Sequence, residues 1–170
     1  MESTTSLVAG APAAHDGSHD FDFLFGGWRI TNHRLLRRLA GCTDWETFVA
    51  QQKAWPILGG LGNMDEFRPE SWKPGFIGMT LRLFNPSAQR WSIYWMDNQG
   101  VSLEPPVMGR WQGDTGIFTG TDVFAGKTIT VRFTWQRLGP EAARWEQEFS
   151  PDQGNNWEKN WIMEFTRDGR

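Results

Sequence analysis

The sequence predicts an all-β protein: a single antiparallel β-barrel of about ten strands, calycin-like or lipocalin-like, with a flexible N-terminal tail. Eleven tryptophans occur among 170 residues, and most stand in short runs where aromatic and polar residues alternate. Because successive side chains of a strand point to opposite faces, such runs indicate strands with one aromatic face. Strand-like runs recur about every 8–12 residues between turn residues, a spacing typical of barrels and sandwiches.

Length and composition limit the domain organisation. We expect a tail over residues 1–20, rich in Ser, Thr, Ala, Gly and Pro, and one barrel domain over residues 21–170. The net charge of −3 gives no basic field for nucleic acid, and no apolar run approaches the roughly 18 residues of a membrane span. The single cysteine, Cys42, permits no internal disulfide. We therefore expect a cytoplasmic protein without nucleic-acid or membrane partners, and leave open a homodimer.

The elements follow from the runs and the turn residues between them. Ordered structure is expected to begin at residues 21–28, where a glycine pair precedes Trp28, which plugs one end of the barrel. Pro56 is expected to end the second strand, because proline cannot donate to a strand ladder. The expected strands cover residues 28–36, 46–55, a segment ending at 67, 76–84, 90–97, 107–112, 116–124, 127–135, 144–150 and 157–167.

The predicted strands form a meander, and a meander of this size has two exposed edges unless it closes. Closure into a barrel removes both edges. Barrels of eight or more strands have room inside for side chains or for one small ligand. A shift of one residue in register would exchange the two faces, so the sequence leaves open whether the interior is hollow or packed.

The sharpest local motif lies between the last two predicted strands. Residues 150–157 match the Asp-box pattern S-x-D-x-G-x-x-W. In this pattern Asp152 accepts hydrogen bonds from turn amides, Gly154 adopts a positive φ, and Trp157 folds onto the hairpin. Propellers repeat the box in every blade, whereas this chain carries one copy. The motif therefore predicts a rigid hairpin rather than carbohydrate chemistry.

Charged residues give few candidates for chemistry. His33 is the one histidine inside the expected domain, and no cluster of His, Asp and Glu has metal-ligand spacing, so we expect no metal. Arg132 and Glu146 lie on the strand face opposite the aromatic residues. With four more charged residues they are expected to form ion pairs on the solvent face: Arg144, Glu148, Glu158 and Glu164.

A few polar residues fall on the aromatic face. Gln147 stands between Trp145 and Phe149, and Asn63 and Asp65 precede Phe67. Ligand pockets are apolar surfaces with a few placed polar groups, which this pattern resembles, although buried polar residues satisfied by the backbone would give the same pattern. The predicted ligand-binding residues are Asn63, Asp65, Trp95, Gln147 and Trp161.

Three segments resemble a bacterial family of hypothetical proteins of unknown function, related in pattern to lipocalin-like and calycin barrels: residues 21–28, 90–95 and 144–167. The resemblance implies a barrel with an internal cavity and carries no established activity. A more distant likeness is to nitrobindin-type haem barrels, which carry a haem-ligating histidine on the final strand. No histidine follows His33 in this chain, so we expect neither haem nor another cofactor.

Three functions remain open from the sequence. The leading one is the binding of a small, largely apolar or aromatic molecule. The second is a cofactor-independent isomerase, cyclase or hydratase, with Tyr94, Glu146, Asp65 or His33 as acid or base. The third is a packed barrel that acts through protein–protein contacts at its surface.

Overall fold

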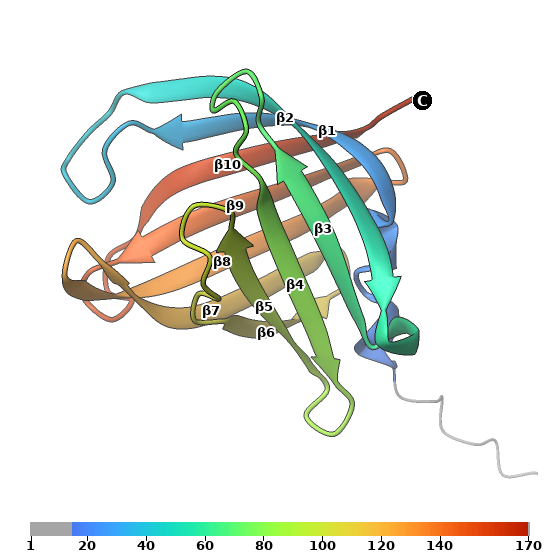
Figure 1. Ribbon diagram of the computed structural model, residues 1–170. Helices are drawn as coiled ribbons and strands as arrows, with labels where there is room; N and C mark the ends of the chain where they lie inside the picture. The colour runs from blue at the N-terminus through green and yellow to red at the C-terminus, as the bar shows by residue number, and fades with distance from the viewer. Residues whose placement is uncertain (1–14, 170) are drawn as a thin grey trace, which may run out of the picture.

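The computed structural model describes residues 15–169, which form a closed barrel of ten antiparallel strands (Figure 1). Each strand pairs with its sequence neighbours and the first strand pairs with the last, giving the order β1-β10-β9-β8-β7-β6-β5-β4-β3-β2. This confirms the predicted fold class. The strands are β1 (Gly26–Leu35), β2 (Trp45–Ile57), β3 (Gly62–Arg68), β4 (Gly78–Asn85), β5 (Arg90–Asp97), β6 (Val107–Gln112), β7 (Thr115–Phe124), β8 (Lys127–Gly139), β9 (Ala142–Ser150) and β10 (Glu158–Arg167).

The connections alternate between two ends of the barrel. At the closed end lie the N-terminal 3-10 helices η1 (Gly17–His19) and η2 (Asp22–Leu24), and η3 (Leu58–Gly60) between β2 and β3. At the open end lie the longer loops, which join β1 to β2 (residues 36–44), β3 to β4 (69–77) and β5 to β6 (98–106). The closed end is therefore covered by short 3-10 helices, and the open end is bordered by loops.

The prediction that Pro56 ends the second strand is wrong. β2 continues through Pro56 to Ile57, and Pro56 pairs with Asn63 of β3. The pairing of β2 with β1 stops at Ala54, so one side of β2 has no ladder at this point. A proline without an N–H is tolerated where a strand has an unpaired side.

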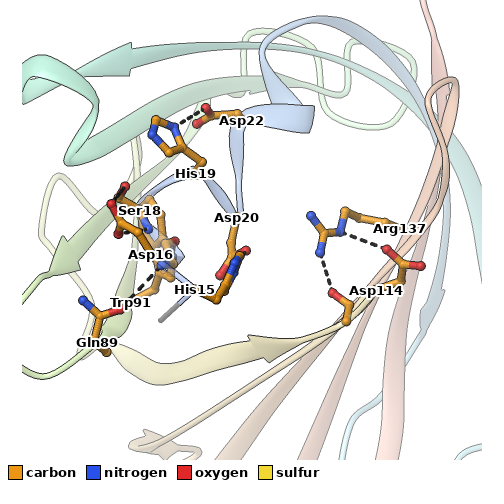
Figure 2. A network of polar contacts seen from close by, with 12 residues as sticks. His15, Asp16, Ser18, His19, Asp20, Asp22, Gln89, Trp91, Asp114 and Arg137 are labelled. Atoms are coloured by element: carbon orange, nitrogen blue, oxygen red, sulfur yellow. Dashed lines mark hydrogen bonds and ion pairs between the residues drawn. The ribbon is translucent and has the colours of Figure 1, made fainter. Parts of the chain in front are cut away.

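The predicted boundary between tail and barrel needs a correction, because part of the predicted tail packs on the barrel. Ser18 and Asp20 are buried, and Trp91 Nε1 donates a hydrogen bond to the Gly17 carbonyl at 2.9 Å. Figure 2 shows this segment, where His15 contacts Asp20 at 2.9 Å. The packed chain therefore begins before residue 21. Residues 1–14 of the predicted tail lie outside the described residues.

Aromatic side chains fill the closed end. Phe21 is fully buried, and its ring meets those of Trp91 and Trp111 edge-on, with centroids 5.0 and 5.2 Å apart. Trp28 is 1% exposed and donates from Nε1 to the Leu24 carbonyl at 2.8 Å. These contacts agree with the expectation that Trp28 plugs one end of the barrel, and they bring η1 and η2 into the same plug.

Charged residues on the outer wall form ion pairs, both between neighbouring strands and along β9. Arg132 contacts Glu148 at 2.7 Å, and Arg144 contacts Glu146 at 2.8 Å and Glu164 at 3.0 Å. The predicted ion-pair face is therefore the solvent face, and the aromatic face is the interior. Glu158 is an exception to the predicted ion pairs, because it pairs in register with the buried Phe149 and accepts hydrogen bonds from the Leu39 amide. Among residues 15–169, no helix is both long enough and apolar enough to cross a membrane.

Candidate functional site

The barrel encloses a cavity of about 270 Å³ between the aromatic plug and the open end. The interior is therefore not completely filled by side chains. About half of the residues that line the wall are aromatic, among them Phe67, Trp72, Phe76, Trp95, Phe133, Trp135, Trp145, Trp161 and Phe165. Such a surface stabilises a flat apolar molecule by burial and by ring stacking.

Local features of the backbone aim two of these tryptophans. A β-bulge in β10 between Lys159 and Trp161 shifts the register against β9, and bulges re-aim side chains. Trp161 Nε1 then donates to Asn32 Oδ1 at 3.0 Å, which fixes the indole against the wall. Trp95 lies over Gly78, where any added Cβ would overlap the indole ring.

The cavity wall also carries a few polar groups. Gln147 donates from Nε2 to Asn160 Oδ1 at 2.8 Å. Gln52 is 7% exposed, and its Nε2 is buried without a hydrogen-bond partner in the part of the chain that the structure describes. Because a buried amide without a partner costs about 1–3 kcal/mol, Gln52 is prepared to bind a polar atom placed inside the cavity.

Arg82 lines the cavity and is held from behind by two acceptors. Its Nη1 donates to Asn63 Oδ1 at 2.9 Å, and its Nη2 lies 2.7 Å from Asp65 Oδ2, an ion pair whose angle departs from that of a hydrogen bond. The exposed fractions of the Arg82 and Asp65 side chains are 3% and 0%. Burial raises the pKa of the Asp65 carboxyl, and Arg82 and Thr80 offset only part of that effect.

The open end carries a second hollow of about 190 Å³, which shares Arg38, Trp95 and Gln147 with the main cavity. Arg38 comes from the loop of residues 36–44, and its guanidinium lies over the rings of Phe124 and Phe149, 4.9 and 5.3 Å from their centroids. Burial lowers the pKa of Arg38 to about 10, aided by the charge of Arg34. The side chain therefore keeps its proton at neutral pH.

Glu104 also lines the open end, opposite in charge to Arg38. Burial raises the pKa of the Glu104 carboxyl, and the negative charges of Asp122 and Asp97 raise it further. The mouth of the cavity therefore combines one cation with several acidic groups.

The structure brings together three of the predicted ligand-binding residues and places two behind them. Trp95, Gln147 and Trp161 line the cavity, while Asn63 and Asp65 lie behind Arg82 and orient it. The predicted ligand-binding residues thus form part of the cavity wall and the groups that orient Arg82.

The predicted catalytic candidates separate. Asp65 is in the interior, whereas Glu146 pairs with Arg144 and Lys159 on the outer wall. Burial alone would raise the pKa of Glu146, but hydrogen bonds from Lys159 and Arg144 outweigh it and lower the pKa.

His33 lies on the outer wall too, with Nδ1 3.1 Å from Thr47 Oγ1 and Nε2 3.6 Å from Glu164 Oε2. Tyr94 borders the cavity, but it alternates with the inward-facing Ile93 and Trp95, so its ring points outward. Within residues 15–169, no three His, Cys, Asp or Glu side chains gather as metal ligands would.

Sequence reasoning missed Gln52 and Arg82. For Arg38, which stands close to His33 in the sequence, it allowed contact with an anion but favoured a solvated basic edge. A signal existed for Arg82, since it stands two residues before Phe84 on the same face of a predicted strand, and an arginine on a core face needs a partner. Gln52 alternates in the same way with Ala50 and Ala54. Arg38 belongs to a loop, where periodicity carries no information.

The Asp-box hairpin lies at the open end, between β9 and β10. Asp152 Oδ1 accepts from the Asn156 amide at 2.8 Å, Ser150 Oγ accepts from the Gly154 amide at 2.7 Å, and Gly154 has φ 94°. Trp157 Nε1 donates to the Gly154 carbonyl at 3.0 Å. None of these groups lines the cavity.

Comparisons with known proteins inform the fold. The chain matches no protein-family profile and no curated protein. Among solved structures, an S-type phycobiliprotein lyase from Guillardia theta is similar, with a TM-score of 0.62 and 10% sequence identity over 92% of this chain and 94% of that chain. At this identity the likeness shows a shared barrel fold alone.

Proposed function

We propose that this barrel binds a small, largely apolar or aromatic molecule in its interior cavity. The observation that carries the proposal is the combination of a cavity of about 270 Å³, a wall rich in aromatic rings, and the buried amide of Gln52, which has no hydrogen-bond partner among residues 15–169. Binding pockets for small molecules have this composition, with a few polar groups that orient the ligand.

The comparison with the phycobiliprotein lyase supports the proposal only through the architecture. A barrel of this fold in another protein serves a lyase, so the fold is compatible with ligand chemistry, and the ligand of this chain must be inferred from its own wall. We also propose a cytoplasmic location, which the unpaired Cys42 supports.

The test is a direct search for the ligand. Protein purified from its own host is examined by native mass spectrometry for a retained small molecule, and the emptied protein is titrated with an apolar fluorescent probe. We expect saturable binding of one probe per chain and quenching of tryptophan emission. Trp161→Ala should lower the affinity for the probe, whereas Trp45→Ala, which replaces an exposed tryptophan, should not. Absence of saturable binding across a broad apolar library would refute the proposal.

A cofactor-independent isomerase, cyclase or hydratase is the second candidate. It is favoured by Asp65, a fully buried carboxyl of raised pKa that contacts a cavity-lining arginine. Strongly perturbed carboxyls next to cavities are typical of acid–base chemistry as well as of structural ion pairs. A retained molecule that leaves the protein unchanged supports binding, and conversion of that molecule supports the enzyme.

A further inference from the structure

We infer that the open end of the barrel selects ligands with an anionic oxygen head group, which pairs with Arg38 while the aromatic body fills the cavity. The inference rests on the proposed binding function and names the ligand class. It comes from Arg38, a guanidinium at the mouth that has no contacting acceptor among residues 15–169.

Arg38 differs from the other arginines that are at least half-buried. Arg34 pairs with Glu46 at 3.0 Å, and Arg82 and Arg132 have carboxylate partners at 2.7 Å. Three more contact a carboxylate or backbone carbonyls: Arg137, Arg144 and Arg167. Within residues 15–169, Arg38 has neither a hydrogen bond nor an ion pair, and its contacts are the faces of two phenylalanine rings.

The loop that carries Arg38 is anchored next to it. The amide of Leu39 donates to both carboxylate oxygens of Glu158, at 2.8 and 3.0 Å, and Leu39 packs against the core. The guanidinium is therefore held at the mouth by a fixed backbone. The charges of Glu104 and Glu158 act on Arg38 from nearby, but neither carboxylate forms an ion pair or hydrogen bond with it in residues 15–169. A partly buried guanidinium without a contacting acceptor is unfavourable, and an anion that binds there relieves this cost.

The chemistry of the head group follows from the guanidinium. Its planar fork of N–H donors matches carboxylate and phosphate oxygens, which it can bind through two parallel hydrogen bonds. The rings of Phe124 and Phe149 cover one part of the guanidinium and leave its edge for the ligand. An uncharged head group would gain only a fraction of this interaction.

The opposite end of the ligand meets a different group. Gln52 lines the same cavity as Arg38 but lies farther from the open end, where β2 pairs with the start of β1 at Trp28. Its unpartnered amide fits a neutral polar atom on the buried end of the molecule. The predicted ligand is therefore asymmetric, with an anion at the mouth and a neutral polar group inside.

Acidic groups near the mouth should have the opposite effect to Arg38 on the binding of anionic ligands. Glu104 lines both hollows with Arg38, and Asp97 and Asp122 lie near it. These charges oppose the binding of an anion. Removing the Glu104 charge should therefore strengthen anionic ligands, and removing the Arg38 charge should weaken them.

The experiment compares two probes with the same aromatic body, 1-pyrenebutyrate and the neutral 1-pyrenebutanol, by fluorescence titration. We expect the wild-type protein to prefer the carboxylate by about tenfold, despite its net charge of −3. Arg38→Gln should remove this preference and leave the affinity for the alcohol within about twofold. Arg38→Lys should keep part of the preference, and Glu104→Gln should increase it. Arg110→Gln, at an exposed position on β6, is the matched control and should change nothing.

The outcomes are distinguishable. If both probes bind equally, or if the carboxylate preference survives in Arg38→Gln, the inference is wrong while the binding function stands. If neither probe binds, the proposed function itself fails. If Arg38→Gln does not fold, the salt dependence of binding to the wild-type protein tests the inference. The affinity for the carboxylate probe must fall with added salt, while the affinity for the alcohol does not. An anion preference without salt dependence would contradict pairing with Arg38.

Discussion

The buried pair of Asp65 and Arg82 gives the most demanding prediction for stability. Replacing Asp65 with Leu leaves the guanidinium in an interior where both side chains are at most 3% exposed. Arg82 would keep only its contact with Asn63 and the faces of Phe21 and Trp135. Removal of one partner of a buried pair costs about 3–5 kcal/mol, so we expect a loss of that size in the free energy of unfolding.

The assay is a double-mutant cycle measured by denaturant unfolding, followed by tryptophan fluorescence and by circular dichroism to check two-state behaviour. Because replacing both charges removes the uncompensated ion, Asp65→Leu combined with Arg82→Met should be more stable than Asp65→Leu alone. A coupling free energy of at least about 2 kcal/mol is expected. The control is Arg68→Met in the exposed pair with Glu66, which should cost less than about 1 kcal/mol. A loss below about 1 kcal/mol for Asp65→Leu, or additive effects in the double variant, would refute the reasoning.

Three further predictions follow from the same contacts. In Arg82→Met the pKa of Asp65 in the folded protein should rise further above its unfolded value. The free energy of unfolding should therefore be greatest at acidic pH and fall as the pH rises through the folded pKa. Denaturant titrations from pH 4 to 8 measure this, and a flat profile would contradict it. Gly78→Ala should displace the Trp95 indole, destabilise the barrel by about 1–3 kcal/mol and shift tryptophan emission. Asp152→Ala should lower the melting temperature, because the Asn156 amide loses its acceptor, while probe affinity of the folded protein stays unchanged.

The sequence indicates the strands well because alternation in a barrel is a local property. Trp145, Gln147 and Phe149 share a face whatever the rest of the chain does, and this face is the interior. The contacts of polar residues inside the barrel are harder to predict, since Arg82 and Asp65 become partners only through the register of β3 against β4. A single sequence contains no direct information on that register.

The remaining differences have similar physical origins. Residues 15–20 have the composition of a tail, yet they are held by a distant group, Trp91 Nε1, which needs an acceptor when it is buried. Arg38 lies in a loop, and its proximity to Phe124 and Phe149 depends on closure of the barrel. Such contacts join segments far apart in the chain and leave no periodic signal.

The ring of strand pairings has a consequence for the order of events during folding. Nine of the ten pairings join strands that follow one another in the sequence, and only β1 with β10 joins the two ends of the domain. Hairpins between successive strands can form early, whereas the seam must wait until a chain of about 140 residues has been brought into a ring. The seam also positions Trp161 against Asn32. We therefore expect ligand binding to appear only in the last kinetic phase of refolding, so that probe fluorescence reports the moment of closure.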